Sequence, residues 1–109
     1  MDHIDHQQME DLKEIMEDDF QNLIETFLDD ADSKLTELQS ALNNNDSAQV
    51  GALAHSLKGS SSNICAHPLS EVCAQLEKLG KAGDMESAKT VLNNVEAELS
   101  AVREALMAL

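Results

Sequence analysis

The feature that most constrains this chain is a long run of apolar residues at helical spacing. Between Phe20 and Leu42, apolar side chains recur every three or four residues over about six turns, with polar residues between them. An α-helix gathers such positions on one face, whereas a β-strand would divide them between two faces. A helix with one apolar face must pack against other helices to bury it. The run therefore predicts a helical bundle.

Four other segments carry apolar residues at the same spacing. The first is short, and we expect it to dock on a larger body. Its apolar face, within residues 6–16, consists of Met9, Leu12, Ile15 and Met16. The other three segments are long enough for full helices and span about residues 47–64, 68–79 and 85–106.

Polar and glycine-containing stretches separate the predicted helices. The stretch 43–46 is Asn-Asn-Asn-Asp; asparagine tolerates a left-handed backbone, and Asp46 can cap the helix that follows. Pro68 suits the first turn of a helix. Gly80 together with Gly83 is expected to end that helix, and Asp84 to cap the last one.

We therefore predict an all-α fold, an antiparallel four-helix bundle in up-down-up-down order with a short additional N-terminal helix. One domain is expected over residues 1–109, with the capping helix in residues 1–17 and the bundle in residues 18–109. The composition agrees, because 42% of the residues are hydrophobic while only two are Phe and none is Trp or Tyr. Such a composition is typical of helical bundles.

Charge and the N-terminal sequence narrow the partners and the location. Seven basic and 21 acidic residues give a net charge of −14, which would repel nucleic acid and an anionic membrane surface, so we expect neither as a partner. The sequence has no apolar run of about eighteen residues and no secretion signal. We expect a cytoplasmic protein that is monomeric. In a reducing compartment, Cys65 and Cys73 are expected to be free thiols.

The helix predicted over residues 47–64 has an unusual polar face around His55. The positions three and four residues away on either side are Gly51, Ala52, Lys58 and Gly59. Glycine inside a helix costs roughly 1 kcal/mol relative to alanine, so two of them beside one histidine require a reason. We interpret both glycines as keeping His55 accessible.

An exposed histidine with a lysine one turn away suits phosphoryl transfer. A neutral imidazole nitrogen can attack a phosphoryl group when the other ring nitrogen is hydrogen-bonded. Lys58 could place its ammonium beside the phosphoryl oxygens, and Gly59 removes a side chain from the approach. From the spacing alone, an exposed histidine without a role remains an alternative.

A wider set of residues matches a known family. The sequence reads Ala54-His55-Ser56-Leu57-Lys58-Gly59-Ser60-Ser61, then Asn63, Ile64 and Ala66, and then Leu69, Cys73, Leu76 and Glu77. These residues resemble the histidine-containing phosphotransfer (HPt) domain of multistep two-component relays, and the resemblance covers essentially the whole chain. The motif lies in the second long helix of an acidic bundle, where that family carries it. Cys65 departs from the family, which commonly has glycine there.

The resemblance implies a phosphorelay intermediate. His55 would accept a phosphoryl group from a receiver-domain aspartate, or from a hybrid sensor kinase, and pass it to the aspartate of a response regulator. Lys58 would stabilise the phosphate, Gly59 would keep the surface open, and Glu77 would orient the imidazole from the neighbouring helix. The protein would have no kinase activity and no cofactor of its own, with Mg²⁺ on the partner receiver domain, and its complexes would be transient.

Other interpretations of the same residues stay open. An adaptor of this fold would bind a receiver or another partner protein without accepting phosphate. Glu77 could be an ordinary surface glutamate. His67 is a less suitable acceptor, because no lysine follows it one turn later. We assign no metal site, although a flexible N-terminus with histidine in third place, as in Met1-Asp2-His3, can chelate Cu(II).

Overall fold

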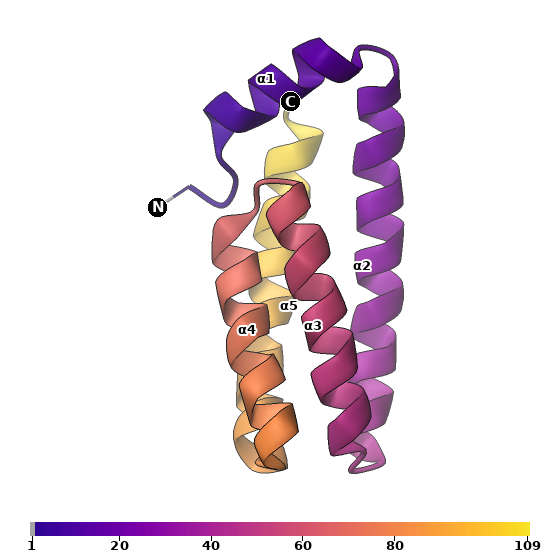
Figure 1. Ribbon diagram of the computed structural model, residues 1–109, viewed down its shortest axis with the longest axis vertical. Helices are drawn as coiled ribbons and strands as arrows, with labels where there is room; N and C mark the ends of the chain where they lie inside the picture. The colour runs from indigo at the N-terminus through magenta and orange to yellow at the C-terminus, as the bar shows by residue number, and fades with distance from the viewer. Residues whose placement is uncertain (1) are drawn as a thin grey trace.

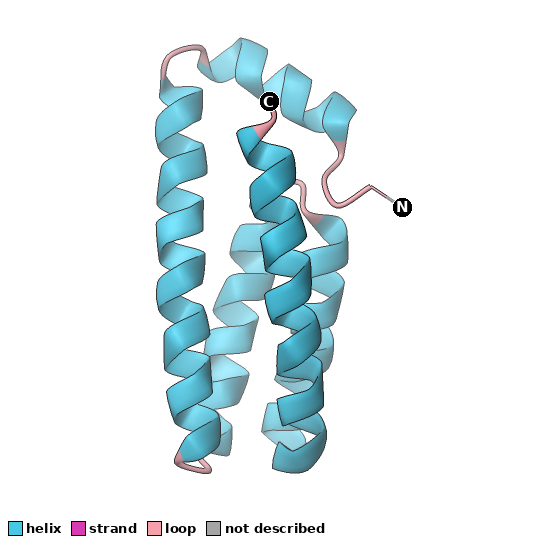
Figure 2. Cartoon of the chain, turned by 180° about the vertical axis from the view of Figure 1, so that it is seen from behind, coloured by secondary structure: helices cyan, strands magenta, loops and turns pink. Residues whose placement is uncertain are grey.

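The computed structural model describes residues 2–109, which form five α-helices and contain no strand (Figure 2). The helices are α1 (His6–Met16), α2 (Asp19–Asn43), α3 (Ser47–Asn63), α4 (His67–Ala82) and α5 (Met85–Met107). Helices α2 to α5 run antiparallel in up-down-up-down order, and α1 lies across the end of the bundle where α5 finishes (Figure 1). Each of the four packs on the next, and α5 closes the ring against α2. The predicted all-α class is confirmed, together with its extra N-terminal helix.

Aspartate side chains cap three of the helices by hydrogen bonds. The side chains of Asp5, Asp46 and Asp84 each accept a hydrogen bond from the backbone N–H three residues later, over 3.0, 3.1 and 3.2 Å. Each cap satisfies one of the free N–H groups at a helix start and contributes about 1 kcal/mol. Helix α4 starts without such a side-chain cap, and Pro68 lies in its first turn, where the missing N–H costs no helix bond.

The bundle core is built from the apolar faces that the sequence pattern predicted. Buried side chains from α2 to α5 include Phe20, Ile24, Phe27, Leu28, Leu38, Val50, Leu57, Leu69, Leu76, Leu92, Val95, Leu99 and Val102. Within residues 2–109, no helix is both long enough and apolar enough to span a membrane.

Helix α1 buries a narrower face than the sequence pattern predicted. Met9 is fully buried, and Leu12 and Met16 pack partly against the core, but Ile15 is 79% exposed. Because α1 crosses the end of the bundle, it can bury only a narrow stripe of its surface. The assignment of Ile15 to the buried face was therefore wrong.

Helix α4 ends as predicted at one glycine but not at the other. Gly83 has a left-handed backbone with φ of 76° and follows the last residue of the helix. Gly80 lies inside the helix instead, buried against Gly51 of α3. The prediction that Gly80 helps to end the helix was wrong, because this glycine serves a close contact between two helices.

Three turns contain a residue other than glycine with positive φ, and the first is Glu17, between α1 and α2, with φ of 51°. Asn45, between α2 and α3, has φ of 55°, in keeping with the tolerance expected of asparagine. Cys65, between α3 and α4, has φ of 63°, a conformation that glycine adopts without steric cost. The backbone thus explains why related sequences would favour glycine there. Cys65 and Cys73 are free thiols, as predicted.

Candidate functional site

His55 lies midway along α3 on the face turned away from the bundle core. Its side chain is 67% exposed. It borders a shallow depression of about 410 Å³, which is lined by Ala48, Gly51, Ala52, His55, Glu77 and Lys81. The ring is therefore open to a second protein, and its exposure follows from a position opposite the buried residues Leu53 and Leu57.

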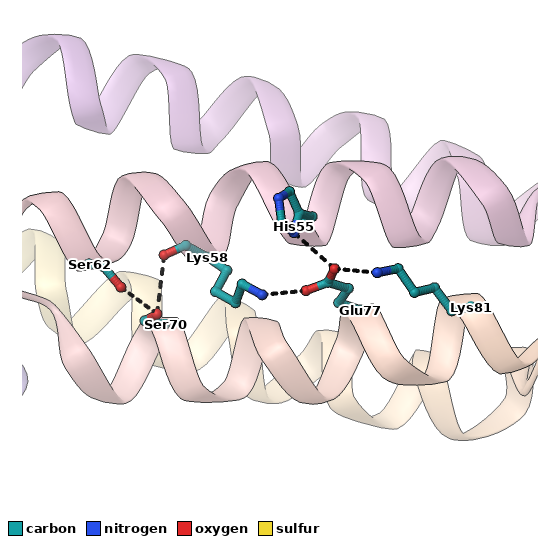
Figure 3. Close-up of polar contacts among 6 residues, drawn as sticks. All are labelled: His55, Lys58, Ser62, Ser70, Glu77 and Lys81. Carbon is teal, nitrogen blue, oxygen red and sulfur yellow. Dashed lines mark hydrogen bonds and ion pairs between the residues drawn. The ribbon is translucent and has the colours of Figure 1, made fainter.

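Glu77 of α4 is the residue that contacts this ring. Its Oε2 lies 2.9 Å from Nδ1 of His55, and the glutamate side chain is only 7% exposed. The alternative of an ordinary surface glutamate is therefore wrong, since Glu77 is buried at the contact between α3 and α4 (Figure 3).

Two lysines also hold Glu77, one from each helix. Nζ of Lys58 donates to Oε1 over 2.7 Å, and Nζ of Lys81 donates to Oε2 over 2.8 Å (Figure 3). These hydrogen bonds, above all that from Lys58, lower the pKa of Glu77 to about 2, although burial opposes the shift. Glu77 is consequently ionised at neutral pH.

The ionised carboxylate determines which nitrogen of His55 is free. A carboxylate without a proton can only accept hydrogen bonds, so Nδ1 of His55 must donate to Glu77. In the neutral ring, Nε2 then keeps its lone pair. The arrangement leaves an exposed nucleophilic nitrogen on a ring held from behind, which is suited to attack on a phosphoryl group.

Lys58 lies where the sequence placed it, one turn after His55, and its amine is engaged by Glu77. Serine side chains support this part of the helix contact. Oγ of Ser70 donates to the carbonyl of Lys58 over 3.1 Å and lies 2.8 Å from Oγ of Ser62 (Figure 3). Lys58 is one-third exposed, so its amine can also reach a group bound at the surface.

The two glycines that flank His55 have different roles. Gly59 is exposed, and a Cβ added there would meet no atom within 4 Å, so it leaves open space beside His55. Gly51 is buried against α4, where an added Cβ would lie 3.4 Å from Cγ of Lys81. The interpretation of Gly51 as an access residue was therefore wrong; it lies in the contact between α3 and α4.

The sequence analysis missed Lys81 and Ser70. Lys81 had a usable signal, because a lysine four residues after a glutamate lies on the same helix face. Ser70 had none, since its contact depends on how α3 and α4 are aligned along each other.

The other candidate residues lie apart from this cluster. Nε2 of His67 contacts Oε1 of Gln8 over 3.0 Å near α1. Burial raises the pKa of the Cys73 thiol to about 12, which makes it a packing residue. Nδ1 of His3 contacts Glu98 over 2.7 Å, and Met1, part of the possible Cu(II) chelate, lies outside the described residues. Across residues 2–109, no group of three or more acidic, histidine or cysteine side chains is placed to hold a metal ion.

Comparison with known protein families identifies the family of this chain. The model of the Hpt domain matches residues 22–105, which include His55 and Glu77. The chain belongs to the Hpt family. As an Hpt domain, it has a histidine phosphotransfer role in phosphorelays, works in transient partnership with receiver domains and is of a kind that carries no cofactor of its own.

Solved Hpt structures share its fold over nearly the whole chain. Histidine-containing phosphotransfer protein B (HptB) from Pseudomonas aeruginosa PAO1 is 33% identical, with a TM-score of 0.93 over 97% of this chain and 92% of that one. The histidine-containing phosphotransfer protein ZmHP2 from maize is 27% identical, with a TM-score of 0.84 over 94% of this chain and 82% of that one. Comparison with curated protein sequences gave no match.

Proposed function

We propose that this protein is a phosphorelay intermediate whose phosphoryl acceptor is Nε2 of His55. The donor is a receiver-domain aspartyl phosphate, directly or within a hybrid sensor kinase, and the acceptor is the aspartate of a response regulator. The observation that carries the proposal is the hydrogen bond from Nδ1 of His55 to the buried Glu77, which leaves Nε2 free on an exposed helix face.

The chemistry is a direct displacement at phosphorus. The lone pair of Nε2 attacks the phosphorus atom, the N–P bond forms, and the bond from phosphorus to the aspartyl oxygen breaks, so that the aspartate leaves as a carboxylate. The ring then carries a positive charge and still has its proton on Nδ1. Glu77 lies opposite that proton and stabilises the charged ring. Transfer to the second receiver reverses these bond changes.

Lys58 and Gly59 serve the incoming phosphoryl group. The amine of Lys58 would leave Oε1 of Glu77 for the phosphoryl oxygens and neutralise part of their charge. Lys81 would keep Glu77 paired after that exchange. The open space at Gly59 admits the receiver surface. The Mg²⁺ required by the aspartyl phosphate site is expected on the receiver, where it would polarise the phosphoryl oxygens.

The receiver would dock over the exposed part of α3. Ala48 and Ala52 are exposed, line the depression at His55 and carry small apolar side chains. They leave a low surface on which a receiver can bring its aspartate to His55. Cytoplasmic location and a monomeric state remain predictions.

The experiment is transfer from a panel of phosphorylated receiver domains to the purified protein, to His55→Gln and to the control His67→Gln. Glutamine is polar and similar to histidine in length but has no nucleophilic nitrogen. We expect an acid-labile, alkali-stable phosphate in the native protein and in His67→Gln, and none in His55→Gln. Incubation with ATP alone should give no phosphorylation.

The adaptor alternative has a distinct result in the same experiment. If receivers bind the native protein and His55→Gln equally, and neither accepts phosphate from any of them, the protein is an adaptor. Phosphate of unchanged amount in His55→Gln would mean that another residue is the acceptor.

A further inference from the structure

We propose that Gly80 is a positioning residue for the candidate site. Its lack of a side chain lets α3 and α4 approach closely enough for Glu77 to hold His55. The inference rests on the role proposed for His55, but it concerns a backbone contact one helical turn away from the reacting ring.

The contact belongs to a row of paired residues that we term the α3–α4 seam. In order along the seam, the pairs are Ser62 with Ser70, His55 with Glu77, and Gly51 with Gly80. The two helices are antiparallel (Figure 1), so the residues of each contacting pair lie at one level along them. The glycine pair is therefore the neighbour of the His55 pair, about 6 Å further along the helix axis.

The backbones of α3 and α4 meet at the glycine pair. A Cβ added to Gly80 would lie 2.7 Å from the backbone nitrogen of Gly51, 3.1 Å from its Cα and 3.0 Å from Cγ1 of Val50. Two of these three atoms are backbone, so a change of side-chain rotamer cannot relieve the contact. Any residue larger than glycine at position 80 must move the helices apart.

The helix separation that Gly80→Ala requires is large enough to break the hydrogen bond between His55 and Glu77. An ordinary contact needs about 3.5 Å, so the helices would separate by about 0.8 Å at this level. The distance from Nδ1 of His55 to Oε2 of Glu77 is 2.9 Å, and a similar increase would place it beyond hydrogen-bond range. Glu77 would then stay with Lys81, which lies on its own helix.

The two glycines of the pair are not equivalent, and this provides a matched control. The atoms nearest to a Cβ on Gly51 would be Cγ of Lys81 at 3.4 Å, the backbone nitrogen of Lys81 at 3.7 Å and the carbonyl of Glu77 at 3.9 Å. These are ordinary contacts, so alanine fits at position 51 and does not fit at position 80. A methyl group added at position 80 should therefore push the helices apart, whereas one added at position 51 should leave their spacing unchanged.

The test compares Gly80→Ala with Gly51→Ala by two measurements. Long-range ¹H–¹⁵N spectra at about pH 8.5, where imidazoles are neutral, report which nitrogen of His55 carries the proton; His55→Gln assigns the signal. Phosphoryl transfer from a receiver gives the rate. We expect Gly80→Ala to lose the Nδ1–H preference and to transfer about tenfold more slowly, an effect typical of losing a partner that orients histidine. Gly51→Ala should keep the native proton position.

The outcomes separate this inference from the proposed function. A folded Gly80→Ala protein with the native proton position and native rate would overturn the inference, whatever His55→Gln does. If Gly80→Ala does not fold, Gly51→Val replaces it, because a larger side chain at position 51 faces the backbone nitrogen of Lys81 and the carbonyl of Glu77 on α4. A folded Gly51→Val protein with an unchanged His55 spectrum would also overturn the inference, and a partial loss of the Nδ1–H preference would support it.

A double-mutant cycle shows whether Gly80 acts through Glu77. Gly80→Ala should slow transfer in the native background but add little in Glu77→Gln, because the contact that it disturbs is already altered. Equal effects in both backgrounds would show that Gly80 matters only for general stability.

Discussion

Across the contact between α3 and α4, the exposed ring of His55 is hydrogen-bonded to the buried carboxylate of Glu77. The histidine ring is 67% exposed, whereas the glutamate to which its Nδ1 donates is 7% exposed. Among residues 2–109, Glu77 is the only charged side chain in the buried set. Burying a carboxylate is costly unless it is paired, and here two lysines and one histidine provide the partners. The site thus pairs an exposed histidine ring with a buried carboxylate.

Replacing the carboxylate of Glu77 by an amide should slow phosphoryl transfer without removing the phosphoryl acceptor His55. In Glu77→Gln, the amide can accept from or donate to His55, so both neutral forms of the ring are supported and the charged ring loses a countercharge. We expect transfer to slow by about tenfold. Rapid-quench transfer assays measure this rate, with Glu71→Gln, a change at an exposed glutamate of the same helix, as the control. A native rate in Glu77→Gln would show that the ring needs no such partner.

The lysine proposed to bind phosphate should matter more than the other one. Lys58→Ala removes a charged donor from the reacting group, and we expect a loss of about 10²-fold in transfer rate. Lys81→Ala should cost less, because that lysine serves Glu77 alone in the proposal. Lys78→Ala, on an exposed part of α4, should transfer at the native rate. If Lys81→Ala were slower than Lys58→Ala, the assignment of the phosphate contact would pass to Lys81.

Glu77 should make stability depend on pH in the acid range. Its pKa is lowered from 4.5 to about 2 in the folded protein, so its stabilising effect is complete above the unfolded value and disappears as the pH falls through the folded one. The difference in free energy of unfolding between native protein and Glu77→Gln should shrink from pH 5 to pH 2. Urea unfolding across that range measures it. A difference that stays constant would mean that Glu77 has an ordinary pKa.

Substitutions of Gly59 should leave the fold stable or stabilise it, but long side chains there should slow phosphoryl transfer. Because an added Cβ meets no atom within 4 Å, Gly59→Ala should stabilise the protein by about 1 kcal/mol through helix propensity alone. A long side chain, as in Gly59→Gln, should leave the fold intact while slowing transfer from every receiver. Thermal unfolding and transfer assays on the same samples test both statements. Native transfer by Gly59→Gln would remove the access role.

Cys65 offers a site at which the native residue is not the most stable one. Its φ of 63° disfavours residues with a Cβ, so Cys65→Gly should raise stability by about 0.5–1 kcal/mol even after the loss of its packing contact. Cys65→Ala is the control, because it removes the thiol but keeps the Cβ, and it should give no gain. Equal melting temperatures for Cys65→Gly and Cys65→Ala would show that the turn carries no strain.

Much of the fold could be predicted because its determinants are local. Apolar spacing defined each helix, and caps such as Asp46 and Asp84 act on backbone groups within three residues. The same local reasoning located His55, Lys58 and Gly59 on one helix. Ile15 was misjudged because the width of the face that α1 buries depends on the elements below it.

The remaining features depend on how two helices align, which local spacing does not specify. Gly51 and Gly80 each looked like a surface or terminal residue, and only their mutual contact explains them. Glu77 could be matched to His55 through the family resemblance, but its burial and its two lysine partners follow from the alignment of α3 with α4. The reacting residues of α3 could thus be predicted from local spacing, whereas the contacts that α4 makes with them could not.

The described part of the chain begins and ends near α1 (Figure 1), and this bears on how the protein can be joined to others. His55 lies eight residues before the end of α3, or about 12 Å along the helix from the turn between α3 and α4. A flexible tether at either terminus could therefore deliver a fused receiver to His55 without covering it, and would raise the local receiver concentration into the millimolar range. In such a fusion, phosphoryl transfer between the receiver and His55 would take place within one polypeptide and would not require two molecules to meet.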